Sequence, residues 1–377
     1  MNRICIVTWY ISENYGTCLQ SYALHKLLSQ ENECVFLNRR TYYGSGMKIW
    51  YLKKAITKCI EKKNQLIGKL TNRNQEEAKN CKQKKINRYR ECINKRYSFV
   101  DIAGKDDINK LNAWADCFIV GGDQMWNPYV YTPAYMLDFV DEKKRKVSYG
   151  TSLGVEQVPS KYKKELSKYL SRFDSICVRE ESGAKIVEEA TGKAAEVHLD
   201  PTLLLSKEEW QEFSNTNLSS QICNIPEEHV VCYFLGDNEE NWASARNICE
   251  ATGLKMVVIP MNASDYSRGD YRIDDATAQD FLHLINTARY VLTDSFHAIV
   301  FSLIFEIDFY VFNRFKADDK KSQQTRIFNL LNTYGLSDRK WTGKMDKPID
   351  YKPVRELILS KRENSLKYLF ASIKGEL

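Results

Sequence analysis

Short apolar runs alternate along the chain with longer amphipathic segments. In the first half, apolar runs predict strands at 4–9, 34–37, 117–120, 146–149, 175–178 and 196–199. Helical periodicity predicts helices at 17–28, 161–170 and 180–190. A second series predicts strands at 230–235, 255–259, 290–293 and 309–312, with a helix at 241–251. This alternation is typical of parallel sheets covered by helices, and therefore of an α/β fold.

The length of the chain, 377 residues, predicts two domains rather than one. We expect two Rossmann-like domains that face one another across a cleft, in a glycosyltransferase-B-like arrangement. The predicted boundaries are 1–199 for the first domain, 200–345 for the second and 346–377 for a C-terminal helix that returns to the first. Asp200-Pro201-Thr202 favours a crossover at the boundary, because proline disfavours continuation of a strand or helix.

A basic helical insertion of about 47–97 interrupts the first domain. Residues 39–97 contain 18 Lys and Arg against 4 Glu, an excess of positive charge that is larger than the net charge of +6 of the whole chain. One face carries the apolar residues Ile49, Leu52, Ile56 and Ile60, and lysines flank it at Lys53, Lys54, Lys58, Lys62 and Lys63. This pattern is typical of a helix on an anionic membrane surface, and more often of a solvated arm that packs its apolar stripe on its own domain.

The cysteines and the amino terminus indicate in which cellular compartment the protein is expected. The 11 cysteines include no Cys-x-x-Cys pair, which favours reduced thiols and no structural metal. The first ten residues lack the apolar core and cleavage site of a signal peptide, and they are interpreted as a strand. We therefore expect a cytoplasmic protein.

Two candidate binding segments follow predicted strands, where ligands of parallel sheets bind. Segment 12–17 can offer free helix amides to an anion or a sugar hydroxyl, although a plain turn with a helix cap explains it equally well. Segment 121–128 combines paired glycines with Asp123, Trp126 and Asn127. Such side chains bind sugar rings and hydroxyls, whereas paired glycines are also typical of a tight turn.

Two further segments carry cationic side chains at strand ends. Arg179 follows the strand at 175–178 and can clamp a carboxylate or phosphate, unless it only pairs with Glu180 or Glu181. His297 lies in the first turn of the helix after strand 290–293, either as a site residue or as a structural histidine. We expect Asp294 to cap that helix, and both cationic residues to lie outside the core.

Together these segments resemble the polysaccharide pyruvyl transferase family, from the first strand to the region of Arg326. The likeness rests on Asn14-Tyr15-Gly16, Gly121-Gly122-Asp123-Gln124-Met125-Trp126-Asn127-Pro128, Ser148-Tyr149-Gly150-Thr151-Ser152-Leu153-Gly154, Val178-Arg179-Glu180, Asp200-Pro201-Thr202 and Thr293-Asp294-Ser295-Phe296-His297. The chain departs from other branches at Ser295, where they carry an arginine.

The resemblance implies a transferase that moves a pyruvyl group from phosphoenolpyruvate to a sugar of a surface, capsular or exopolysaccharide precursor and forms a ketal. It implies catalysis by His297 and Arg179. Donor binding is implied for Arg179, His297, Ser295 and Arg314. Acceptor binding is implied for Asn14, Tyr15, Asp123, Trp126 and Asn127. No cofactor or metal is implied, and Arg314 or Arg326 would replace the charge missing at Ser295.

Two alternative functions stay open. A nucleotide-sugar glycosyltransferase would use the same two domains, and a non-catalytic glycan-binding protein would need no reaction. The implied partners are phosphoenolpyruvate and a sugar acceptor carried on a polyprenyl diphosphate, with peripheral attachment to the inner membrane face through the insertion. Nucleic acid is not expected, because the lysines lack interleaved aromatic residues.

Overall fold

The computed structural model describes residues 1–12, 14–38, 42, 79–81, 83–84, 86–88, 95–130, 132–314 and 325–377. The apolar stripe and lysines of the predicted membrane-surface helix lie outside these residues, so that expectation stays a prediction.

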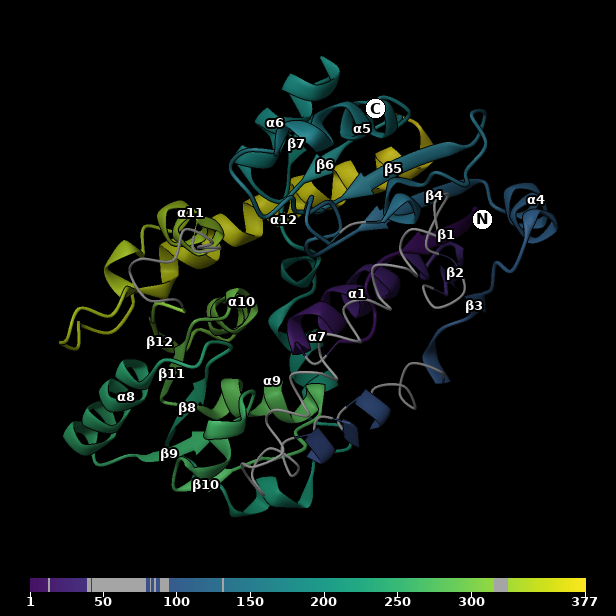
Figure 1. The fold of residues 1–377 in the computed structure, drawn as a ribbon. Coiled ribbons are helices and arrows are strands. Elements are labelled where there is room, and N and C mark those ends of the chain that lie inside the picture. Colours follow the sequence, from purple (N-terminus) through teal and green to yellow (C-terminus); the bar gives the residue numbers. More distant parts are fainter. Residues whose placement is uncertain are drawn as a thin grey trace, which may run out of the picture.

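The first domain is built on five parallel strands in the order β3-β2-β1-β4-β5 (Figure 1). The strands are β1 (Arg3–Val7), β2 (Glu33–Leu37), β3 (Phe99–Val100), β4 (Cys117–Gly121) and β5 (Arg145–Tyr149). A second parallel pair, β6 (Cys177–Val178) and β7 (Glu196–Val197), continues beside β5 through bridges at Ser175 and Val178. The helices of this domain are α1 (Tyr15–Leu28), α4 (Lys105–Trp114), α5 (Ser160–Leu170), α6 (Glu181–Thr191) and the 3₁₀ turn η1 (Pro133–Met136).

The second domain repeats this plan with five parallel strands in the order β10-β9-β8-β11-β12. The strands are β8 (His229–Tyr233), β9 (Lys255–Val258), β10 (Tyr271–Arg272), β11 (Tyr290–Thr293) and β12 (Asp308–Val311). Its α-helices are α7 (Lys207–Ser214), α8 (Glu239–Thr252), α9 (Ala278–Thr287), α10 (Phe296–Phe305) and α11 (Thr325–Thr333). Short 3₁₀ turns are η2 (Pro201–Leu204), η3 (Ser220–Asn224), η4 (Ala263–Ser267) and η5 (Ser337–Arg339). The predicted α/β fold with two sets of parallel strands is confirmed.

The order of the strands fixes where each domain can bind a ligand. In each sheet the order reverses beside the first strand, between β1 and β4 and between β8 and β11. At such a switch point the neighbouring connections leave on opposite faces, and a crevice opens at the carboxyl ends of the strands. The loops after β4 and β11 carry two of the segments that the sequence analysis selected.

Helix α1 of the first domain packs against α7, α9 and α10 of the second domain. All ten residues of α10 are buried, which suits a helix that is apolar around its whole circumference. Tyr15 at the start of α1 stacks on Phe281 of α9, with ring centroids 4.7 Å apart, and Tyr22 contacts Phe213 at 4.4 Å. The apolar core is therefore continuous from one domain to the other.

The C-terminal helix α12 (Tyr351–Lys374) runs along both domains (Figure 1). Near its start the Tyr351 hydroxyl donates to the carbonyl of Ile307 at 2.6 Å, within the second domain. Further along, Ser365 Oγ accepts the backbone N–H of Leu199 at 3.2 Å, beside β7. The helix therefore connects the two sheets as well as covering them.

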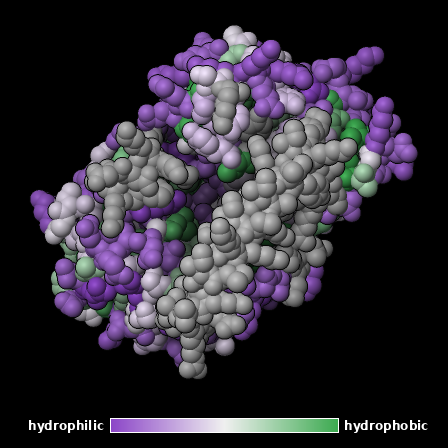
Figure 2. Space-filling model, in the orientation of Figure 1, coloured by the Kyte–Doolittle hydropathy of each residue, from purple (hydrophilic) through white to green (hydrophobic). Residues whose placement is uncertain are grey.

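The surface seen in Figure 2 is mostly hydrophilic, with small hydrophobic patches and a hollow between the two halves of the molecule. No helix within the described part of the chain is long and apolar enough to cross a membrane. The nine cysteines in that part are all free thiols, and burial raises the pKa of Cys117 and Cys177 to about 12.

Candidate functional site

The loop after β4 is shaped by glycine. Gly122 has a φ of +65°, and a Cβ atom there would lie 1.5 Å from Oε1 of Gln20 on α1. Only glycine fits this close approach, which brings the following Asp123 against α1. Thr17 Oγ1 donates to Asp123 Oδ2 at 2.5 Å, so the carboxylate is held at the start of that helix.

Arg179 follows β6, and its side chain is only 4% exposed. Its Nη1 donates to Asp200 Oδ2, and its Nε lies 4.0 Å from Glu180 Oε2. Burial opposes the charge of the guanidinium, but the carboxylates of Asp200 and Glu180 outweigh it and raise the pKa of Arg179. Arg179 and Glu180 belong to the first domain and Asp200 lies at the predicted boundary, whereas the ring of Phe296, 4.5 Å from the guanidinium carbon, comes from the second domain.

Asp200 joins the two cationic side chains that the sequence analysis selected. Its Oδ1 accepts the backbone N–H of Thr202 at 2.9 Å, while its Oδ2 faces Arg179 and lies 3.6 Å from His297 Nε2. Burial alone would raise the pKa of this carboxyl group. The charges of Arg179 and His297 outweigh it and hold the pKa well below its usual range.

His297 lies in the first turn of α10, with 5% of its side chain exposed. Its ring packs against Gly16 of α1, where an added Cβ atom would lie 2.0 Å from the His297 Cγ. Contrary to expectation, Arg179 and His297 are therefore buried rather than outside the core. The absence of a side chain at Gly16 is what allows the two domains to meet at this ring.

Arg326, at the start of α11, completes the cationic cluster. With the Gln124 amide oriented so that its oxygen faces Arg326, that oxygen accepts from Nη2 at 2.5 Å and from Nη1 at 3.2 Å. The guanidinium carbon lies 5.7 Å from the centroid of the Phe296 ring, which also contacts Arg179. Burial, and then the charge of Arg179, lower the pKa of Arg326 to about 10.

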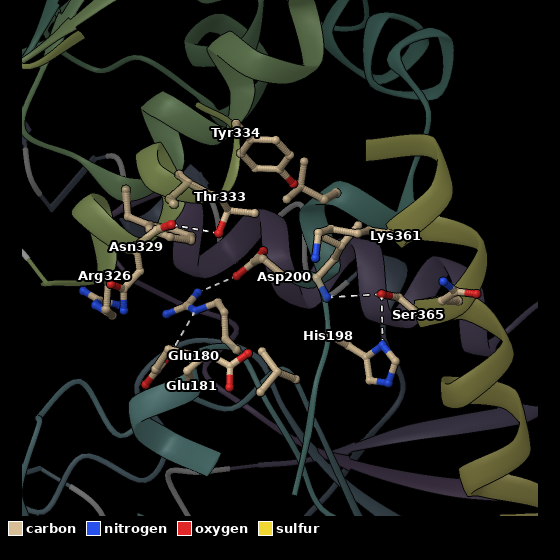
Figure 3. Close-up of a pocket in the computed structure, with 17 residues that line it drawn as sticks. Glu180, Glu181, His198, Asp200, Arg326, Asn329, Thr333, Tyr334, Lys361 and Ser365 are labelled. Atoms are coloured by element: carbon tan, nitrogen blue, oxygen red, sulfur yellow. Dashed lines mark hydrogen bonds and ion pairs between the residues drawn. The ribbon is translucent and has the colours of Figure 1, made fainter. Parts of the chain in front are cut away.

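A cavity of about 300 Å³ opens beside this cluster, and we call it the donor cavity (Figure 3). Arg179 and Glu180 line it from the first domain, Asp200 from the predicted boundary, and Arg326 and Phe296 from the second domain. Helices α11 and α12 close it, and Lys361 extends into it from α12 (Figure 3). The cavity thus lies between the domains, at the carboxyl ends of β6 and β7.

The residues implied to bind the acceptor fall into two groups, one in the loop after β4 and one with its rings in the core. Asp123 and Asn127 lie in the loop after β4, both less than 9% exposed, close to Gln124. Tyr15 and Trp126 are fully buried, and their polar groups donate to the backbone carbonyls of Ala276 and Tyr135. Neither of these two rings lines the cavity described above.

Asn14 caps α1, because its side chain accepts the N–H of Gly16 at 3.0 Å. The sequence of segment 12–17 was compatible with a helix cap as well as with a binding loop, and this contact is a helix cap.

The loop after β11 corrects one expectation. Asp294 does not cap α10, since its carboxylate accepts the backbone N–H groups of Leu235 and Gly236 at 2.7 and 2.8 Å. Burial raises its pKa, and Arg314 compensates from 3.6 Å. Arg314 also donates to the Asp294 carbonyl at 2.9 Å, so this arginine is engaged in the loop rather than directed at the donor cavity. Ser295 is buried with its hydroxyl unpaired among the described residues.

Glu180 and Asp200 were not selected from the sequence. Glu180 Oε1 accepts from Ser152 Oγ at 2.8 Å and from the backbone N–H of Leu153 at 3.0 Å, which ties β6 to the loop after β5. Both acids follow short strands, as Arg179 does. Their position after a strand could have identified them as site residues. The sequence analysis instead interpreted Glu180 as a partner of Arg179 and Asp200 as part of a crossover.

Solved structures show the fold that this geometry suggests. UDP-GlcNAc 2-epimerase from Neisseria meningitidis superposes with a TM-score of 0.54 at 10% identity, covering 100% of both chains. A putative UDP-N-acetylglucosamine 2-epimerase from Listeria monocytogenes gives 0.49 at 11% identity, covering 95% of this chain and 94% of that one. At 10% identity, the first of these superpositions shows a similar fold and nothing about function. It supports two Rossmann-like domains.

The sequence comparisons decide the family. No curated protein matches the chain in sequence. The family model of polysaccharide pyruvyl transferase matches residues 14–314, which include the loops after β4, β6 and β11. The chain therefore belongs to the polysaccharide pyruvyl transferase family.

Proposed function

We propose that the protein transfers a pyruvyl group from phosphoenolpyruvate to hydroxyl groups of a sugar. The observation that carries this proposal is a set of buried donors on Arg179 and Arg326, which line the donor cavity, and on His297, which does not line it but lies against Asp200 of its wall. Arg179 Nε and Nη2, Arg326 Nε and His297 Nε2 have no hydrogen-bond partner within the described part of the chain. A buried donor without a partner costs about 1–3 kcal/mol. A ligand with a carboxylate and a phosphate supplies acceptors for several of them at once.

Arg326, rather than Arg314, is our candidate for the charge that other branches carry at the position of Ser295. Arg326 lines the donor cavity and shares the Phe296 ring with Arg179. Arg314 is engaged by Asp294 in a separate loop. The arginine would thus come from α11, beyond the stretch that the family model matches, and reach the same ligand from another direction.

Ketal formation sets the roles that the residues would have. One sugar hydroxyl loses its proton and adds to C2 of phosphoenolpyruvate while C3 gains a proton. The C2–O bond to phosphate then breaks, and a second hydroxyl adds to C2 and gives its proton to the departing phosphate. We assign the proton transfer to His297, whose orientation Asp200 would fix from 3.6 Å. Arg179 and Arg326 would stabilise the carboxylate and the departing phosphate. Asp123 and Asn127 would orient the acceptor.

Binding and turnover test the proposal. Phosphoenolpyruvate should raise the melting temperature, whereas nucleotide sugars should not, because a ligand stabilises the folded state that binds it. Mass spectrometry of a candidate oligosaccharide incubated with phosphoenolpyruvate should detect the ketal. His297→Ala and Arg179→Ala should abolish transfer, and His283→Gln, which changes a partly exposed histidine of α9, should not. Stabilisation by nucleotide sugars alone would instead favour a glycosyltransferase.

We further propose a lipid-linked acceptor, which places the enzyme at the inner membrane face. The support is the basic insertion, since each Lys or Arg near an anionic surface contributes about 1 kcal/mol. Sedimentation with anionic liposomes should be salt-sensitive and should fall when Lys53, Lys54, Lys58, Lys62 and Lys63 become Glu. Binding that ignores salt, or none at all, would leave the insertion as an arm of the first domain.

A further inference from the structure

A second cavity, of about 600 Å³, lies beside α1 and shares no lining residue with the donor cavity. Its first-domain wall consists of Tyr22 on α1 and the end of the basic insertion, Arg88 and Lys95–Tyr97. Its second-domain wall runs from Phe213 through 217–220 to the start of α9. In Figure 1 the described pieces of 79–97 lie near α1 and α9. A ligand bound here would contact both domains.

The charge of this cavity is one-sided. Its described lining includes three cations, Arg88, Lys95 and Arg96, and no carboxylate. Arg88 is compensated by Asp275 at 3.1 Å, whereas no described residue forms an ion pair with Lys95 or Arg96. The buried Asp280 nearby is already used, because its two oxygens accept the backbone N–H groups at 219 and 277. Two positive charges therefore remain without a partner among the described residues.

Aromatic rings hold one of these cations in place. The guanidinium carbon of Arg96 lies 5.4 Å from the centroid of the Tyr22 ring and 5.2 Å from that of Phe213. A guanidinium that contacts ring faces keeps its N–H groups available in its own plane. Tyr97 and Tyr10 extend the aromatic lining, so apolar surface and charge lie side by side.

The polar lining is of the kind that recognises hydroxyl groups. Ser219, Ser220, Asn217 and Gln279 bring hydroxyl and amide groups to the second-domain wall. A ligand that suits the whole cavity has about two negative charges and an apolar or ring-shaped part. A phosphate monoester and a diphosphate diester both meet this description, and an isolated inorganic ion does not use the rings.

We propose that this cavity binds an organic phosphate, with its phosphate on Lys95 and Arg96 and its organic part on the rings of Tyr22 and Phe213. The site goes beyond pyruvyl transfer and does not depend on the chemistry of the donor cavity. The described end of the basic insertion lines it, and these cations would raise the local concentration of anionic ligands.

Calorimetry on the full chain tests the site, with inorganic phosphate, glucose 1-phosphate and hexyl phosphate as probes. At least one ester should bind more tightly than inorganic phosphate, and the tighter ester indicates whether a sugar or a lipid carries the phosphate. Arg96→Gln and Lys95→Gln should each weaken that binding about tenfold, the effect of losing one charged hydrogen bond. Arg96→Lys should keep most of it. Lys84→Gln, an exposed change outside the cavity, is the matched control and should have no effect.

The proposal is overturned if Arg96→Gln and Lys95→Gln leave the affinity unchanged in protein with native circular dichroism. It is equally overturned if Arg326→Gln, and not Arg96→Gln, removes binding, because the ester then occupies the donor cavity. Equal affinity for inorganic phosphate and both esters would also refute it. Stabilisation by phosphoenolpyruvate should persist in Arg96→Gln, so the two proposals can fail separately.

Discussion

Replacing Arg326 by glutamine is expected to stabilise the ligand-free protein and to weaken its response to phosphoenolpyruvate. Burial and the nearby Arg179 lower the pKa of Arg326 from 12.5 to about 10, so folding disfavours the charged guanidinium. Because the folded-state pKa lies below the ordinary value, the penalty is fully present below about pH 10 and disappears as the pH rises toward 12.5. At neutral pH the glutamine variant therefore lacks the full penalty for burying the charged guanidinium.

The size of the effect follows from the contacts. A pKa lowered from 12.5 to about 10 corresponds to about 3 kcal/mol, at about 1.4 kcal/mol for each tenfold change. The substitution also removes the hydrogen bonds to Gln124 and the contact with the Phe296 ring, which together contribute about 1–2 kcal/mol. The net gain is about 1–2 kcal/mol. With about 2 cal/mol/K of unfolding entropy per residue, a chain of this length gains about 1–3 °C in Tm.

Thermal unfolding at pH 7.5, with and without phosphoenolpyruvate, measures both effects. The variant should unfold at a higher temperature than the wild type without ligand and should lose most of the rise that the ligand produces. Arg246→Gln, which removes an exposed arginine of α8, should change neither value. A lower Tm for ligand-free Arg326→Gln, or a full ligand response, would refute the reasoning that this arginine is held at a cost for anion binding.

Three further substitutions test the site. Gly16→Ala places a Cβ about 2.0 Å from the His297 Cγ and should reduce kcat about 100-fold in folded protein, because the imidazole must move; unchanged kcat would contradict this. Asp200→Asn should cost about 3–5 kcal/mol in urea unfolding at neutral pH. Since the pKa of Asp200 is depressed, the wild-type advantage should shrink only as the pH falls through strongly acidic values, and an advantage independent of pH would count against the ion pair. Trp126→Phe loses the indole bond to Tyr135 and should cost about 1–3 kcal/mol of stability while ligand binding persists; lost binding in folded protein would restore its predicted acceptor role.

The alternation of apolar runs was sufficient to predict most of the parallel strands, because strands buried on both faces are apolar throughout. It missed β3 and β10, which have only two residues each and therefore contain no apolar run. It also located Arg179 and His297, which follow their strands directly. The burial of both side chains was not predictable in this way. It depends on the contact between α1 and α10, and in particular on Gly16, which is distant from His297 in sequence.

Other site residues depend on pairings that no local pattern contains. Trp126 has the composition of a sugar-binding residue, yet its indole is oriented by a carbonyl nine residues later, in η1. Asp200 reads as the end of a strand, and only the pairing of β6 with β7 brings it to Arg179. Arg326 follows no strand directly, so the sequence named it only as an alternative to Arg314, and the lining of the cavity distinguishes the two.

Helix α12 has a consequence for how the protein is made. The contact between His198 and Ser365 joins residues separated by 167 positions. At the usual speed of translation, about 5–20 residues per second, the ribosome needs about 10–30 s to reach Ser365 after it has added His198. During that interval the flank of the first domain beside β7 has no α12 to cover it. The nascent first domain must therefore wait for nearly the whole polypeptide before its own surface is complete, and this exposed flank is where a chaperone would be most useful.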